Sequence, residues 1–142
     1  MRVALLTREY PPDVYGGGGV HVEYLARELT GLVDLTVHAW GEDRPGAVGH
    51  QPWDRLTGDA HLAALGALSV DLSMAAAVQD AAVAHSHTWY ANLAGHLAKL
   101  AYRMPHVMTA HSLEPLRPWK SSAAGTLCPV GANRSRSRAP MR

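Results

Sequence analysis

The sequence predicts an α/β fold in which helices cover both faces of a doubly wound parallel sheet. Two observations lead to this fold class. Short, continuously apolar runs, typical of strands buried on both faces, alternate along the chain with longer stretches of helical spacing. The first apolar run is followed by a glycine-rich loop and a helix. At 142 residues the chain is long enough for one domain with a hydrophobic core.

The chain opens with a β-α-β unit. Residues 2–7 form an apolar strand, the glycine run Gly16 to Gly19 follows it, and helical spacing begins near Val20. Gly31 is placed to end this helix, because glycine commonly follows the last helical residue. Residues 32–39 return to strand character. The crossover between two such strands is right-handed in nearly all parallel sheets.

The rest of the chain continues this alternation. Residues 40–52 hold three glycines and two prolines and are typical of a loop. Two helices, a strand, a helix and a strand are then expected over residues 59–68, 70–78, 81–86, 89–102 and 106–110.

Composition restricts the class of protein. A hydrophobic content of 47% with 18% charged residues is typical of a globular protein. We find neither an apolar run of about 18 residues nor a signal-like start, and we therefore expect a cytoplasmic protein with no membrane partner. Cys128 is the only cysteine, so no intrachain disulfide or cysteine-based metal site is expected.

The net charge of +1 is unevenly distributed. All twelve acidic residues lie between Glu9 and Glu114, whereas Arg134, Arg136, Arg138 and Arg142 lie near the end of the chain. No aromatic side chains alternate with these arginines, and we expect no nucleic-acid partner.

The glycine run predicts an anion site. Glycines let backbone N–H groups approach a ligand closely, and the helix that follows directs its unpaired N–H groups to the same point. A phosphate or diphosphate is the expected ligand. NAD is disfavoured because His21 stands where a third glycine would be needed, and ATP because the lysine and hydroxyl of a P-loop are missing. A loop without a ligand is the alternative.

Histidines follow two of the predicted strands. The carboxyl ends of parallel strands meet at one edge, so His85, His87 and His111 with Ser112 are expected to face the same crevice as the glycine run. His85 and His87 point to one face of their strand and, with His111, could bind a metal. No carboxylate lies beside them in sequence, and a metal-dependent hydrolase is therefore the weaker interpretation. A stand-alone nucleotide- or phosphate-binding module is another alternative.

Three segments of the chain resemble a known family: residues 7–22, with Tyr-Pro-Pro-Asp-Val-Tyr-Gly-Gly; residues 85–91, His-Ser-His-Thr-Trp-Tyr-Ala; and residues 109–115, Thr-Ala-His-Ser-Leu-Glu-Pro. Together they resemble the N-terminal, Rossmann-like domain of retaining GT-B glycosyltransferases, and specifically the actinobacterial-type glycogen synthases of the GT4 group. The resemblance covers residues 1–120.

The resemblance implies transfer of glucose, with retained configuration, from ADP-glucose to an α-1,4-glucan or to glucose 1-phosphate; the second acceptor would give maltose 1-phosphate. No metal and no cofactor beyond the donor are implied. His111 would lie against the transferred sugar as the catalytic residue, and the run Gly16, Gly17, Gly18 and Gly19 would bind the donor diphosphate. The residues implied to line the cleft are Tyr10, Asp13, Tyr15, His21, His87, Trp89, Ser112 and Glu114.

The chain departs from the family pattern at two places. Thr88 stands where related synthases carry an aspartate. After Lys120 the expected glycine-rich continuation is replaced by residues 121–142, whose codons could restore it in a neighbouring reading frame. We therefore expect a frameshifted, disordered tail, an incomplete GT-B fold with an unpaired sheet edge, and an inactive fragment. A genuine terminus is the alternative.

Overall fold

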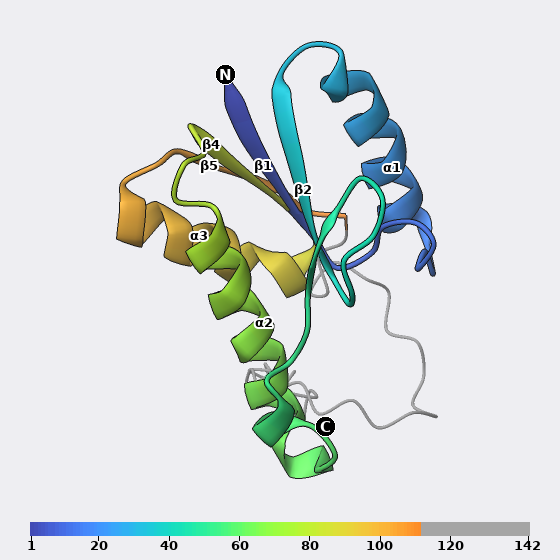
Figure 1. Cartoon of the computed structure of the whole chain (residues 1–142), viewed down its shortest axis with the longest axis vertical. Helices are drawn as coiled ribbons and strands as arrows, with labels where there is room; N and C mark the ends of the chain where they lie inside the picture. The colour runs from blue at the N-terminus through green and yellow to red at the C-terminus, as the bar shows by residue number, and fades with distance from the viewer. Residues whose placement is uncertain (112–142) are drawn as a thin grey trace, which may run out of the picture.

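A computed structural model describes residues 1–111 of the chain (Figure 1). The elements follow each other in the order β1 (Arg2–Thr7), α1 (Gly17–Thr30), β2 (Asp34–Trp40), β3 (Val48–His50), the 3₁₀ turns η1 (Asp54–Leu56) and η2 (Ala60–Leu62), α2 (Ala63–Ala77), β4 (Val83–His87), α3 (Trp89–Tyr102) and β5 (His106–Thr109). Strands and helices alternate for most of this length, as the apolar pattern predicts.

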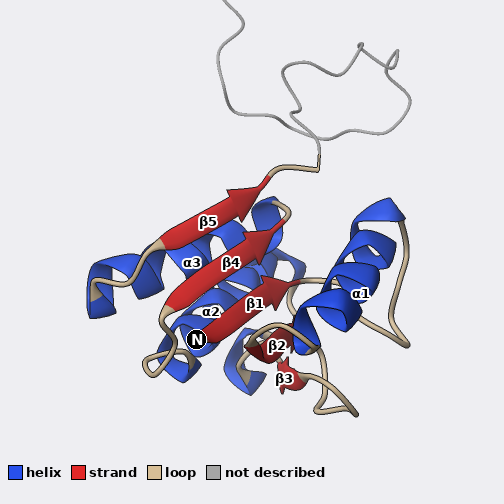
Figure 2. Ribbon diagram, turned by 90° about the horizontal axis from the view of Figure 1, so that it is seen from above, coloured by secondary structure: helices blue, strands red, loops and turns tan. Residues whose placement is uncertain are grey.

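The five strands form one parallel sheet in the order β3-β2-β1-β4-β5. The chain builds outward from β1 to one edge, then returns and builds from β4 to the other. β1 and β4 are therefore neighbours at the point where the direction of winding reverses (Figure 2). This order confirms the predicted Rossmann-like α/β fold, in which ligands bind at that reversal point.

Each face of the sheet has its own core. Ala4 and Leu6 of β1 pack with α2 and α3, whereas Leu5, between them in sequence, packs with Val22 of α1 and Val37 of β2. Successive side chains of a strand point to opposite faces, which explains this division. Leu5 and Leu6 are both fully buried, so the continuous apolar run of β1 corresponds to a strand covered on both sides.

The bounds of β2, β4 and β5 differ from the expected ones by one or two residues, and three features differ by more. α1 begins at Gly17 and not near Val20, so most of the glycine run is helical. β3 lies inside the expected loop, where Gly49 packs against the backbone of Glu42 too closely for any side chain. The two helices expected over residues 59–78 are one helix, α2, preceded by a 3₁₀ turn. Ser69 does not interrupt α2 because its hydroxyl donates to the Gly66 carbonyl oxygen at 2.7 Å.

Residues 60–77, which include α2, correct the expectation that the chain holds no apolar stretch of about 18 residues. This stretch is long and apolar enough, by length and composition alone, to cross a membrane, with a mean hydropathy of 1.4. In the structure, however, Val70, Met74 and Ala75 of α2 pack into the core against the sheet. One face of α2 is therefore part of the core, and 33% of the stretch is buried. The core helix of a folded domain can be as long and as apolar as a membrane-spanning helix.

Within residues 1–111, β5 is an edge strand with two exposed apolar side chains: 49% of Val107 and 59% of Met108 are accessible. The tail expected to be disordered, residues 121–142, lies outside the described residues, as do Ser112 and Glu114.

Candidate active site

The candidate active site lies at the carboxyl ends of the neighbouring strands β1, β4 and β5. The segment from Arg8 to Gly16 leaves the carboxyl end of β1 and leads into α1, Thr88 connects β4 with α3, and His111 follows β5. These three segments are distant in sequence. A Cβ atom placed on Gly18 would lie 3.5 Å from the Thr88 Cγ2 atom and 3.8 Å from the His111 ring, so the three meet at one point.

The N-terminus of α1 is open. Gly16 is its N-cap, with φ −160° and ψ −175°. Within residues 1–111 no side chain caps the first turn and no residue of that turn is acidic, although the Glu9 carboxylate accepts a hydrogen bond from the Gly16 amide just before it. Cβ atoms placed on Gly16 or Gly17 would meet nothing within 4 Å. The amides of Gly17 and Gly18 are therefore left without a side-chain cap among the described residues, and with the positive end of the helix dipole they can serve as an anion site.

Glu9 organises the approach to this helix. Its Oε2 atom accepts hydrogen bonds from the backbone N–H groups of Tyr15, at 3.1 Å, and Gly16, at 3.0 Å. A Cβ on Gly19 would lie only 2.7 Å from the same oxygen, so glycine is needed there to admit the carboxylate. From sequence, Glu9 is better explained as a solvated loop charge. No local motif marks a contact between residues seven apart.

Three histidines form what we call the imidazole cluster: His21, His87 and His111. One ring nitrogen from each lies within 4.8 Å of the other two, and the His87 Nδ1 and His111 Nε2 atoms are 3.1 Å apart. His87, at the end of β4, is fully buried, whereas His21 on α1 and His111 are exposed. The cluster therefore consists of one buried ring, that of His87, and two rings that solvent can reach.

Burial and neighbouring histidines lower the pKa of the His87 and His111 rings. Burial, followed by the neighbouring His85, His111 and His21, lowers the pKa of His87 to about 3. The pKa of His111 is also lowered, by burial and by His21, although the Glu9 carboxylate acts in the opposite direction. At neutral pH each of these two rings offers one donor and one acceptor nitrogen.

His85 is not part of the imidazole cluster, although the sequence suggested it as a metal ligand with His87 and His111. Its ring does lie on the same face as that of His87, with centroids 4.3 Å apart. However, its Nε2 atom shares a hydrogen bond of 2.8 Å with the Thr109 hydroxyl, and His21 takes the third place in the cluster. Nothing in the sequence pairs His21 with the strand histidines, because it reaches them from the opposite side of the crevice.

Thr88 carries backbone strain at the centre of the site. Its φ of 66° is rare for a residue other than glycine, and the residue is the N-cap of α3. Within residues 1–111 its buried hydroxyl has no hydrogen-bond partner. Strained residues of this kind concentrate at functional sites.

The remaining expected cleft residues divide into two groups. Tyr15 and Trp89 are 77% and 67% exposed, so both are available to a ligand. Tyr10 and Asp13 instead hold the loop together: they form a short backbone bridge, and Asp13 Oδ2 accepts a hydrogen bond of 2.7 Å from the buried Arg44 guanidinium.

An aromatic group that the sequence did not predict lies beside the site. The Arg8 guanidinium lies 3.9 Å from the centre of the Tyr90 ring and 5.2 Å from that of Trp40. Trp89 stacks on Tyr90 at 3.8 Å. Arg8 follows β1 directly, so its position at the carboxyl edge could have been noted.

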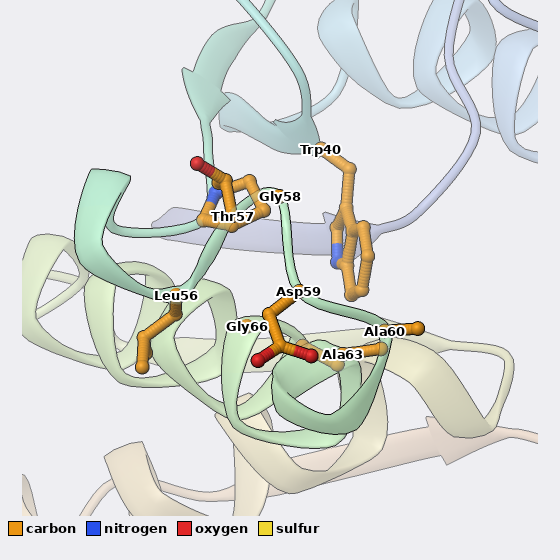
Figure 3. A pocket seen from close by; sticks show the side chains of 10 residues that line it. Trp40, Leu56, Thr57, Gly58, Asp59, Ala60, Ala63 and Gly66 are labelled. Carbon is orange, nitrogen blue, oxygen red and sulfur yellow. The ribbon is translucent and has the colours of Figure 1, made fainter.

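The Trp40 indole also borders a pocket of about 370 Å³ between the 52–60 segment and the start of α2. Figure 3 shows Trp40 opposite Leu56, with Gly58 and Asp59 between them. The lining is mostly apolar, and it includes no residue of the imidazole cluster.

The chain is similar in sequence to proteins of a known family. The pattern of Glycosyltransferase Family 4 matches residues 15–136. The chain is 60% identical over 125 residues, 88% of its length, to a protein of Mycobacterium tuberculosis strain H37Rv named alpha-maltose-1-phosphate synthase, and 57% identical over the same share to the protein of that name from Mycolicibacterium smegmatis. The chain spans about a third, 32%, of the length of these curated relatives.

The matched segment includes α1, β4, α3 and His111, which belong to the candidate site, whereas β1 and Glu9 precede it. A glycosyltransferase is therefore favoured over the stand-alone binding module and the metal hydrolase. Because the family pattern covers most of the chain, the chain belongs to glycosyltransferase family 4.

Proposed function

We propose that this chain forms one wall of the cleft of a retaining GT-B hexosyltransferase that transfers glucose from ADP-glucose. The preferred acceptor is glucose 1-phosphate, because the relatives are named alpha-maltose-1-phosphate synthase. An α-1,4-glucan, as in glycogen synthases, is the second candidate acceptor. We further propose a cytoplasmic location and no cofactor other than the sugar nucleotide.

The juxtaposition of an open helix N-terminus with a neutral histidine carries the proposal. Within residues 1–111 no side chain caps the amides of Gly17 and Gly18, whereas the Gly16 amide is bonded to Glu9. A Cβ atom on Gly18 would lie 3.8 Å from the His111 ring. In glucosyl transfer, negative charge develops on the departing diphosphate. Preorganised backbone donors stabilise such charge without reorganising during the reaction.

His111 is suited to the transferred sugar. A neutral imidazole can donate or accept a hydrogen bond with a sugar hydroxyl, whereas an imidazolium would compete with α1 for the diphosphate. The lowered pKa of His111 favours the neutral form. We assign His111 the catalytic position, with Tyr15, His21, His87 and Trp89 around the sugar and acceptor.

Nuclear magnetic resonance of the full chain tests the donor site. Titration with ADP-glucose should shift the backbone amide signals of residues 16–18, with an affinity of about 1 mM, or about −4 kcal/mol. Such weak binding is expected because the relatives are about three times longer and the chain supplies one wall. Binding near 1 μM by this chain alone, about −8 kcal/mol, would instead favour a stand-alone module.

Two glycine substitutions provide a matched comparison. Gly17→Ala places a methyl group in the open space of the proposed diphosphate site, and Gly31→Ala places one at the other end of α1. Neither methyl meets atoms closer than 4.0 Å, so both variants should fold. We expect Gly17→Ala to weaken ADP-glucose binding about tenfold, the value of one lost hydrogen bond to a charged group, and Gly31→Ala to leave it unchanged. Equal affinities would contradict the proposed site.

A further inference from the structure

The imidazole cluster has the composition of a metal site as well as of a sugar site. One ring nitrogen from each of the three histidines lies within 4.8 Å of the other two. An ion in tetrahedral geometry with Zn–N distances of about 2.0–2.1 Å holds its nitrogen ligands about 3.3 Å apart. The His87 Nδ1 and His111 Nε2 atoms, at 3.1 Å, are already at that separation. Only the His21 ring, on the exposed rim, needs to move closer.

The pair of nitrogens at 3.1 Å also requires something between them. Two lone pairs cannot face each other at this distance, so either one ring supplies a proton or a cation lies between the rings. Within residues 1–111, the other nitrogen of His87, Nε2, is buried and has no hydrogen-bond partner. No protein group on that side fixes which His87 nitrogen carries the proton, so Nδ1 can present its lone pair to a metal.

The Glu9 carboxylate makes this end of α1 more favourable for a cation than a helix N-terminus alone would be. The positive end of the α1 dipole lies near His21 and disfavours a cation. The Glu9 carboxylate counters it: this group is bonded to the Tyr15 and Gly16 amides at that end, and its charge acts on His111. His21 and His111 are exposed, so an ion can enter and the fourth ligand position can be filled by water.

We propose that His21, His87 and His111 bind a divalent transition metal of the zinc class, with water as the fourth ligand. Imidazole ligands suit Zn²⁺, Co²⁺, Ni²⁺ and Cu²⁺ and disfavour Mg²⁺ and Ca²⁺. The bound ion and its water ligand occupy the space beside His111 and hold its Nε2 atom, the nitrogen that lies 3.1 Å from His87 Nδ1. Resting on the proposed function, the ion therefore competes with the sugar nucleotide and restrains transfer.

Metal binding is measured without donor, so its outcome is independent of the proposed function. The full chain, free of any polyhistidine tag, is titrated with Zn²⁺ by calorimetry and with Co²⁺ by visible absorption, which intensifies when the ion becomes tetrahedral. One ion per chain is expected, with no comparable binding of Mg²⁺. The absence of a stoichiometric Zn²⁺ site would overturn the proposal.

Substitutions locate the ion. His21→Ala and His111→Ala change exposed side chains, so both variants should fold, and each should weaken Zn²⁺ binding by at least about tenfold. The matched control is His96→Ala, an exposed histidine on α3 outside the cluster, which should bind as the unchanged chain does. If His21→Ala retains full affinity, or if His96→Ala loses as much, the ion is bound elsewhere and the assignment is wrong.

Discussion

Histidine side chains meet at two places near the carboxyl edge of the sheet, and the two groups are built differently. His38 of β2 and His50 of β3 form what we call the closed pair, in which both rings are 5% exposed. The His38 Nδ1 and His50 Nε2 atoms are 3.0 Å apart, and the other His50 nitrogen is 2.9 Å from the Ser73 hydroxyl. The imidazole cluster instead has two exposed rings and, among residues 1–111, a His87 Nε2 atom without a hydrogen-bond partner.

The difference shows how the same residue type serves stability or ligand binding. The closed pair connects β2, β3 and α2 through consecutive hydrogen bonds, and no ring nitrogen of His50 is left for a ligand. Within residues 1–111 the His87 Nε2 atom of the imidazole cluster and the hydroxyl of the adjacent Thr88 are buried without a hydrogen-bond partner. Buried polar groups are normally paired, so these two atoms are available to a ligand.

The largest expected effect comes from removing one histidine ring from each group. His50→Ala leaves a cavity and takes away the partner of both His38 and Ser73, so the free energy of unfolding should fall by about 3 kcal/mol. His21→Ala removes an exposed ring and should change it by less than about 0.5 kcal/mol. Urea unfolding followed by circular dichroism measures both. Similar losses for the two variants would show that the imidazole cluster is also structural.

A second test uses pH. Burial, and then the neighbouring His50, lowers the pKa of His38 from 6.5 to about 4. The folded state then binds fewer protons than the unfolded state between these values, so this contribution to stability is complete above pH 6.5 and is lost as the pH falls toward 4. It should amount to about 2 kcal/mol between about pH 7.5 and pH 5.

The matched variant is His38→Asn, whose side-chain amide can reach the position of the His38 Nδ1 atom without titrating in this range. Its unfolding free energy should depend less steeply on pH than that of the unchanged chain. Asp71, whose pKa burial raises to about 6, acts in the opposite direction in both proteins and cancels in the difference. Parallel pH profiles would rule out His38 as a source of acid sensitivity.

The smallest effect is expected at the end of the closed pair. Ser73→Ala removes the hydroxyl that His50 Nδ1 contacts, but it leaves the His38–His50 contact intact, so about 1 kcal/mol of stability should be lost. Ser69→Ala is the control on the same helix; its hydroxyl contacts the Gly66 carbonyl and the Trp53 amide and no histidine. A difference between the two variants in the slope of stability against pH would isolate the coupling of Ser73 to His50.

Apolar patterning predicted most elements correctly because it reports burial directly. The bounds of β1 and α3 agree with the expected residues 2–7 and 89–102. The glycines gave two wrong predictions of a loop. At Gly17 to Gly19 they indicate a loop, but the backbone is helical because α1 must start close to the crevice; at Gly49 they hide a strand, since the glycine there is required by backbone packing.

The sequence by itself determined the α/β alternation, the parallel sheet and the arrival of glycines, His87 and His111 at one edge, because each follows from local periodicity and from the geometry of parallel strands. Tertiary structure alone decided that His21 joins His87 and His111, that His85 is bonded to Thr109, and that Glu9 reaches the Gly16 amide. These contacts depend on how far α1 leans over the sheet and on which ring nitrogens meet. Both are set by packing between segments distant in sequence, which residue spacing does not encode.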